Sequence, residues 1–203
     1  MREDKVFVVN DIIKTFFMES VDKKPVPNFK RHYHGFEALT KHFWIRTLQE
    51  RQIIRHYTVC NAMDPQLYTA YVLCLDADSG RDFDRSLLDT SNQPEMLFNI
   101  KNYQNDKGLS KKLHRMPQGS LLYEVKGPMG KGLQVQRTGV HIAFAAGTGV
   151  LCFVDLVGHL IQANLGLISQ PYAVDLDRFK FIFYVSFASE ADSIALELLE
   201  AFE

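Results

Sequence analysis

The stretch Arg55-His56-Tyr57-Thr58 decides the fold that this sequence predicts. Successive side chains of an extended strand point to opposite faces, so Arg55 and Tyr57 share one face while Thr58 presents its hydroxyl from the other. The guanidinium is a planar fork of donors that suits a phosphate, and the phenol ring suits a flat partner. The same residue types are also common on the plain outer surface of a strand, so the interpretation depends on the segments that follow.

Two motifs follow in order, Ile100-Lys101-Asn102-Tyr103 and Gly108-Leu109-Ser110. Gly108 lets backbone approach an anion closely, and Ser110 is expected to open a helix whose first amide hydrogens have no internal partner. Such a helix start favours a diphosphate, and Lys111 and Lys112 add positive potential. The alternative is an ordinary serine cap before an amphipathic turn.

The second half of the chain has the pattern of a βα unit. The apolar run 140–145 lacks alternation and predicts a buried parallel strand; the turn Gly147-Thr148-Gly149 and a helix over 150–163 follow it. A second buried strand is predicted at 179–187. A further helix opens at Glu190, and its apolar stripe consists of Ile194, Ala195, Leu198, Leu199 and Phe202.

Together with Gly127-Pro128-Met129-Gly130, this ordered set of motifs resembles the ferredoxin-reductase-like superfamily, and most closely its NADH–cytochrome b5 reductase branch. The resemblance covers the chain from about Leu39 to Glu203. It implies a six-stranded antiparallel FAD-binding β-barrel in residues 1–136, followed by a partial parallel-sheet NAD-binding α/β domain in residues 137–203. The implied cofactors are FAD and NADH.

The resemblance also implies a role for each motif residue. Arg55 would bind the pyrophosphate, Tyr57 would lie against the isoalloxazine ring, and Thr58 would hydrogen-bond the ring beside its reactive nitrogen as the catalytic residue. Lys101 and Tyr103 would approach the ribityl and diphosphate portion. The remaining implied cofactor-binding residues are Gly108, Leu109 and Ser110 at the diphosphate and Gly147, Thr148 and Gly149 at the nicotinamide.

The sequence departs from the family pattern in three places. The tract 103–110 is one residue longer, which is expected to shift the amide groups around the diphosphate. Leu151 and Cys152 stand where the family usually has threonine or alanine and then proline, and Cys152 is interpreted as a small buried hydrophobe. The family's later strands have no match before Glu203, so a longer chain, a covering partner and a lost nicotinamide site all stay open.

Seven short segments of the first half are rich in β-branched and aromatic residues and predict strands: 5–9, 16–18, 42–47, 52–58, 68–75, 97–103 and 120–126. About six such strands suit a closed barrel, because closure removes exposed edges. The tract 20–36 predicts an irregular connection, in which His32 and His34 are loop residues rather than metal ligands.

Composition narrows the function classes. Of the 203 residues, 46% are hydrophobic and 23% charged, and the net charge of −1 gives no electrostatic footprint for nucleic acid. Cys60, Cys74 and Cys152 form no Cys-x-x-Cys pair, so no metal site is expected and an intracellular, reducing compartment is favoured. No apolar stretch nears the roughly 20 residues that span a bilayer. Membrane association would therefore need a partner or a missing segment.

Three functions fit these residues. The first is an FAD-dependent oxidoreductase domain that passes electrons from NAD(P)H to a one-electron acceptor protein such as a cytochrome. The second is a non-catalytic structural subunit that is built on the same scaffold, with or without FAD. It would belong to a larger assembly that covers the short parallel sheet. The third is a flavin-binding sensor or electron-relay domain.

Overall fold

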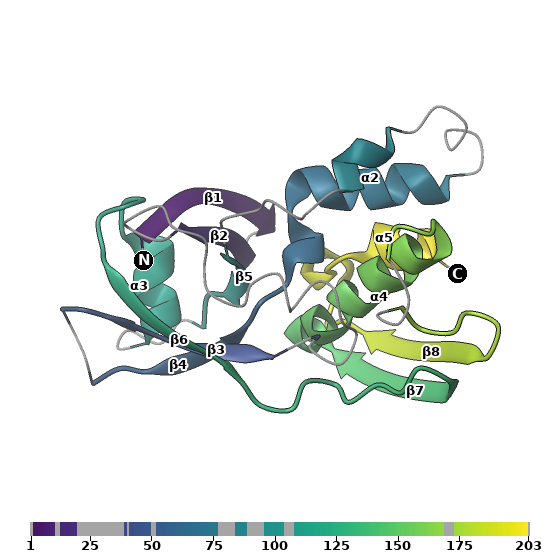
Figure 1. The fold of residues 1–203 in the computed structure, drawn as a ribbon. Helices are drawn as coiled ribbons and strands as arrows, with labels where there is room; N and C mark the ends of the chain where they lie inside the picture. The colour runs from purple at the N-terminus through teal and green to yellow at the C-terminus, as the bar shows by residue number, and fades with distance from the viewer. Residues whose placement is uncertain are drawn as a thin grey trace.

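Six strands form two antiparallel sheets around one core (Figure 1). The structure is a computed structural model, and it describes residues 2–10, 13–19, 39, 41–49, 52–76, 84–88, 96–103, 108–168 and 173–202. The first sheet has the order β1 (Arg2–Asn10), β2 (Ile13–Glu19), β5 (Met96–Lys101). The second has the order β4 (Arg55–Thr58), β3 (His42–Thr47), β6 (Tyr123–Met129).

The two sheets meet through an isolated bridge between Val59, just after β4, and Phe98 of β5. Their inner faces share a core that includes Phe16, Phe43, Ile45 and Phe98. Among the described residues no pairing joins β1 to β6, so the closed six-stranded barrel is not confirmed. The described arrangement is a pair of three-stranded sheets with one connected edge.

The strand predicted at 68–75 is wrong, because this segment belongs to the helix α2 (Pro65–Leu75). Asp64 caps the helix, because its Oδ1 accepts hydrogen bonds from the backbone amides of Gln66 and Leu67. Pro65 occupies the first helical position, where no amide donor is needed. The helix buries Leu67, Ala70 and Tyr71. This spacing places them on one face, and their packing surface comes from distant parts of the chain.

The other strands of the first half lie within a few residues of their predicted positions, and β3 coincides with the segment 42–47. Three short elements complete this half: the 3-10 helices η2 (Asn61–Met63) and η3 (Arg85–Leu88) and the helix α3 (Leu109–Arg115). The tract 20–36, with His32 and His34, lies outside the described residues.

The second half contains the predicted βα unit. β7 (Gly139–Ala146) pairs in parallel with β8 (Phe179–Ser186), and the 3-10 helix η4 (Gly147–Val150) leads from β7 into α4 (Leu151–Asn164). The helix predicted from Glu190 is divided: η5 (Glu190–Asp192) and α5 (Leu196–Ala201) are separated by residues 193–195, of which Ala195, the N-cap of α5, has a φ of 58°. None of the described helices is both long and apolar enough to cross a membrane.

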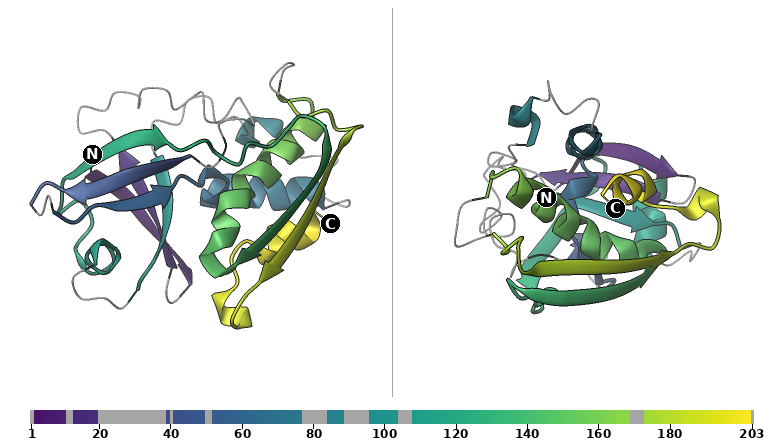
Figure 2. Two further views of the ribbon diagram at one scale, coloured as in Figure 1. Left: turned by 90° about the horizontal axis from the view of Figure 1, so that it is seen from below. Right: turned by 90° about the vertical axis from the view of Figure 1, so that its right-hand side faces the viewer.

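The two parallel strands are not buried on both faces, which corrects the sequence prediction. Their odd-numbered residues face α4. The ring centroids of Phe183 in β8 and Phe153 in α4, for example, lie 4.9 Å apart. The right view of Figure 2 shows α4 on one side of β7 and β8 and no described helix on the other side, which carries the even-numbered residues. The large exposed side chains of this face are Val140 (63% exposed), Ile142 (58%), Phe144 (75%) and Tyr184 (56%).

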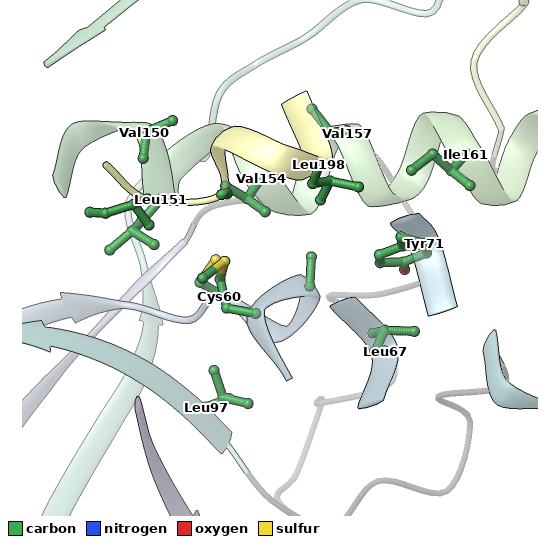
Figure 3. Close-up of a cluster of buried hydrophobic side chains, with 14 of the residues drawn as sticks. Cys60, Leu67, Tyr71, Leu97, Val150, Leu151, Val154, Val157, Ile161 and Leu198 are labelled. Carbon is green, nitrogen blue, oxygen red and sulfur yellow. The ribbon is translucent and has the colours of Figure 1, made fainter. Parts of the chain in front are cut away.

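A second hydrophobic core joins the two halves (Figure 3). Leu67 and Tyr71 of α2 pack with Val154, Val157 and Ile161, which follow one another at helical spacing on α4. Two polar contacts fix α2 to its neighbours: Gln162 Nε2 of α4 donates to Tyr71 Oη at 2.7 Å, and Leu198 N of α5 donates to Tyr68 Oη at 3.2 Å. Because α2 is inserted between β4 and β5, this core positions the strands of the first half against α4.

We expect Gly127→Ala to destabilise the protein by about 1 to 3 kcal/mol, because overpacking a core displaces side chains. A Cβ atom at Gly127 would lie 2.8 Å from Cε1 of the buried Phe43 ring. Urea unfolding measures the change. Gly149→Ala is the matched control, since its Cβ would meet only Ala145 at 3.9 Å and should leave the unfolding free energy unchanged within about 0.5 kcal/mol. Equal stability of both variants would contradict the packing argument.

Candidate functional site

One cleft gathers most of the predicted site residues. It has a volume of about 340 Å³, within the usual range of ligand sites of roughly 300 to 1,000 Å³. Its walls come from β4, the end of β5, the start of α3 and the segment from η4 into α4. The lining residues are Arg55, His56, Tyr57, Thr58, Asn99, Ile100, Lys101, Tyr103, Gly108, Ser110, Thr148, Leu151 and Cys152.

The strand β4 has the alternation that its sequence predicts. Arg55 and Tyr57 pair with Ile45 and Phe43 of β3, so both lie on the face that continues into the core, and Thr58 lies on the other. Tyr57 is half-buried, with its ring edge-on to Phe98 at 6.5 Å. Burial raises the pKa of Tyr57 well above its usual value despite the nearby Arg55 cation, so the phenol is neutral at physiological pH.

The charge in the cleft is positive. Arg55 is exposed, and its Nη1 donates to its neighbour's carbonyl, Ile54 O, at 2.8 Å. Lys101 is the second cation on the walls, and none of the described lining residues is a carboxylate. Two cations without a competing acid, next to the neutral ring of Tyr57, fit a ligand that carries both phosphates and a flat ring system. FAD is such a ligand, so the donor set on these walls fits it.

The start of α3 differs from its prediction. Gly108, in an extended conformation, is the N-cap, and the helix begins at Leu109, so Ser110 does not open it. Leu109 is 1% exposed and packs into the core from the first helical turn, so its side chain points away from solvent. Gly108 and Ser110 line the cleft, whereas Leu109 does not.

The turn after β7 places only one of its three predicted residues on the cleft wall. Gly147 adopts a positive φ of 51°, which glycine tolerates, and thereby turns the chain into η4. Thr148 lines the cleft, while Gly147 and Gly149 do not. Five lining residues were missed by the sequence analysis as ligand contacts: His56, Asn99, Ile100, Leu151 and Cys152. Asn99 and Ile100 directly precede Lys101 in β5, and that adjacency was the available signal.

Cys152 is not the buried hydrophobe that the sequence predicts. It is half-buried at the start of α4, and its Sγ lies 4.0 Å from Thr58 Oγ1 across the cleft. The approach joins the end of β4 to the start of α4. The two walls therefore meet at Thr58 and Cys152.

Asp155 lies one helical turn beyond Cys152 and contacts the segment that follows β4. Its Oδ1 accepts a hydrogen bond from Ala62 N at 2.8 Å. Burial raises the pKa of Asp155 to about 6, against the opposing effect of bonds from the backbone amides of Ala62 and Asn61 and from the Cys60 thiol. The carboxylate is thus costly to ionise in the folded state, even though backbone donors bind it.

A folded-state pKa above the unfolded value means that folding favours the protonated form of Asp155. The contribution of Asp155 to the unfolding free energy is therefore greatest below about pH 4 and is lost as the pH rises through 6. The change is on the order of 3 kcal/mol. We expect the unfolding free energy of wild type, relative to Asp155→Asn, to fall by that order between pH 4 and pH 7.5. Urea unfolding at both pH values measures it, and a constant difference would contradict the assignment.

Comparisons with known proteins identify solved structures that share this fold. No protein-family model and no curated protein matches the sequence. Phthalate dioxygenase reductase, described as a modular structure for electron transfer from pyridine nucleotides to [2Fe-2S], aligns over 100% of this chain at 14% identity and a TM-score of 0.60. The cytochrome b5 reductase domain of Ulva prolifera nitrate reductase aligns over 99% at 16% identity and 0.55. The flavohem-like FAD/NAD-binding domain of nitric oxide dioxygenase from Vibrio cholerae aligns over 98% at 14% identity and 0.59.

These similarities show that the chain has the fold of ferredoxin-reductase-like FAD/NAD-binding proteins, as the resemblance predicts. The chain spans 47% of phthalate dioxygenase reductase and 66% and 67% of the other two structures. It spans about a fifth of two longer solved chains with the same fold.

Proposed function

We propose that this chain is an FAD-dependent oxidoreductase domain that passes electrons from NAD(P)H to a one-electron acceptor such as a cytochrome. The observation that carries the proposal is the cleft, in which Arg55, Tyr57 and Lys101 gather beside Thr58 with no carboxylate among the described lining residues. Structures of the same fold support it, since their names include electron transfer from pyridine nucleotides and FAD/NAD binding.

The protein's part in such chemistry is binding and orientation. FAD, when bound, supplies the capacity to accept a hydride and release electrons one at a time. Arg55 and Lys101 would neutralise the phosphates, and the neutral ring of Tyr57 would lie against the isoalloxazine. Thr58 would donate a hydrogen bond to the ring as the residue nearest the reacting atoms, as its position on the inner end of β4 allows.

The second wall would receive the nicotinamide. Thr148 supplies a hydroxyl there, and Leu151 and Cys152 supply apolar surface that would exclude water from the space beside Thr58. The predicted roles of Gly147 and Gly149 become backbone roles, because the turn they form presents Thr148 to the cleft. NADH is the donor that the resemblance favours.

Colour tests the proposal directly. Purified protein incubated with FAD and then desalted is expected to be yellow, and anaerobic NADH is expected to bleach it as the flavin is reduced. A colourless, well-folded preparation would defeat the flavoprotein proposal. A yellow preparation that neither NADH nor NADPH bleaches would favour the structural-subunit alternative with a retained flavin.

Arg55→Ala is expected to weaken FAD binding by about 1.5 to 3 kcal/mol, a factor of roughly ten to a hundred and fifty in the dissociation constant, because a charge-assisted bond to phosphate is lost. Titration of the apoprotein with FAD, followed by tryptophan or flavin fluorescence, measures the change. Arg178→Ala is the matched control: Arg178 is exposed, pairs with Asp175 and does not line the cleft. Equal affinities in the two variants would place the phosphates elsewhere.

We also propose that a protein partner, either the electron acceptor or a larger assembly, covers the open face of the short parallel sheet. Parallel sheets usually have both faces covered. The even-numbered face exposes Val140, Ile142, Phe144 and Tyr184, and the rings of Phe144 and Tyr184 stack at 5.0 Å. Apolar patches of this kind mark interaction surfaces.

Phe144→Lys is expected to reduce the binding of an apolar fluorescent dye to the isolated chain at least about twofold, since the most exposed ring of the patch is lost. Its FAD affinity should stay unchanged, because Phe144 does not line the cleft. Leu87→Lys, at an exposed position in η3, is the control for an added charge. Dye binding that falls equally in both variants would argue against a specific surface on the sheet.

A further inference from the structure

Asp155 caps the start of η2 from a distant part of the chain, where a neighbouring side chain usually supplies the cap. The N-cap residue of η2 is Cys60, which makes no side-chain capping bond. One of the orphan donors at this helix start is instead bound by Asp155, whose Oδ1 accepts a hydrogen bond from Ala62 N at 2.8 Å. A carboxylate from α4 thus binds a segment that lies about 90 positions earlier in the chain.

The capped segment is the direct continuation of β4. Val59 is bridged to Phe98, and Cys60 N donates to Leu97 O at 3.0 Å, so little slack separates Thr58 from η2. On the other side, Cys152 precedes Asp155 by one turn of the same helix. The bond from Asp155 and the 4.0 Å approach of Thr58 to Cys152 therefore join the same two elements, β4 with η2 and α4.

We propose that Asp155 is a positioning residue: by binding Ala62 N at the start of η2 it holds Thr58 against Cys152 and so sets the separation of the two cleft walls. The proposal rests on the proposed function only for the identity of the ligand that the cleft accepts. The Asp155 carboxylate does not line the cleft, so it acts through Thr58 and Cys152.

The groups around the carboxylate are neutral near pH 7. They are Cys60, the N-cap residue of η2, Tyr71 from α2 and His159 from α4. Burial raises the pKa of Cys60 and Tyr71 and lowers that of His159 to about 4. Among the described residues around the Asp155 carboxylate, a backbone amide rather than a cation binds it. This hydrogen bond to η2 is therefore directional.

Thiol labelling of the protein without FAD tests the proposal. In Asp155→Ala the end of β4 is released, so alkylation of Cys152 by iodoacetamide is expected to accelerate about fivefold to thirtyfold, the range for losing one buried bonding partner. Peptide mass spectrometry follows each cysteine separately. Asp155→Asn retains an acceptor oxygen for Ala62 N and is expected to restore the wild-type rate within about twofold.

Asp64→Ala is the matched control. Asp64 is also a helix-capping carboxylate, and it accepts from Gln66 N and Leu67 N, but it caps α2 and does not line the cleft. Its loss is expected to lower stability while leaving Cys152 labelling unchanged. Cys74, half-buried on α2, is the reference thiol within each molecule, because general unfolding would raise its labelling too.

Two results would overturn the proposal: wild-type labelling of Cys152 in Asp155→Ala, or an equal rise in Asp64→Ala. If Asp155→Ala unfolds, as a parallel rise at Cys74 would show, Asp155→Glu takes its place. That variant displaces the carboxylate by one methylene and should accelerate labelling of Cys152 alone; no acceleration there would overturn the proposal equally. Because labelling needs no FAD, failure of wild type to bind FAD would refute only the proposed function.

Discussion

The packing of α4 against η2 and α2 is the contact on which the rest of the structure depends. Val154, Val157 and Ile161 present one apolar face of α4 to residues from the first half of the chain, and Val150, the N-cap residue of α4, joins the same core. Fully burying each such side chain contributes about 1.5 to 3 kcal/mol. This packing places the start of α4 beside the end of β4. The cleft exists because two segments far apart in sequence are held together by this shared core.

Polar groups within that core give the contact its direction. Apolar surfaces can slide past one another, whereas hydrogen bonds are directional and costly to leave unmade when buried. The bonds of Asp155 to the start of η2 and of Gln162 to Tyr71 fix the helix α4 along its axis. The ionised carboxylate is expensive to bury, so its retention is consistent with a positioning role rather than with stability alone.

The two faces of the short parallel sheet have opposite surroundings, and this asymmetry bears on function. The odd-numbered side chains contact α4, while Phe144 and Tyr184 form an exposed stacked pair. The cleft lies on the β4 side of α4 and requires no contribution from the exposed face. The proposed cofactor site and the proposed partner surface therefore use different parts of the fold, so the loss of one would not require the loss of the other.

The sequence by itself determined the order of motifs, which indicated the class of fold and most of the residues that line the cleft. Arg55, Tyr57 and Thr58 alternate on β4 because side-chain direction in a strand follows from position alone. The helix at 151–164 and the strands on either side of it were likewise predictable from local apolar pattern and the glycine turn. The start of α3 was predicted one position too far along, because Ser110 is the stronger local signal of a helix start whereas Gly108 occupies the N-cap.

Only the tertiary structure decided the features that depend on distant neighbours. The segment 68–75 has residues that suit a strand or a helix, and packing against α4 selected the helix α2. The cysteine at the start of α4 faces Thr58 rather than the core, and Asp155 caps a segment about 90 residues away. Such contacts leave no local signal, since they arise where the folded chain brings α4 and η2 together.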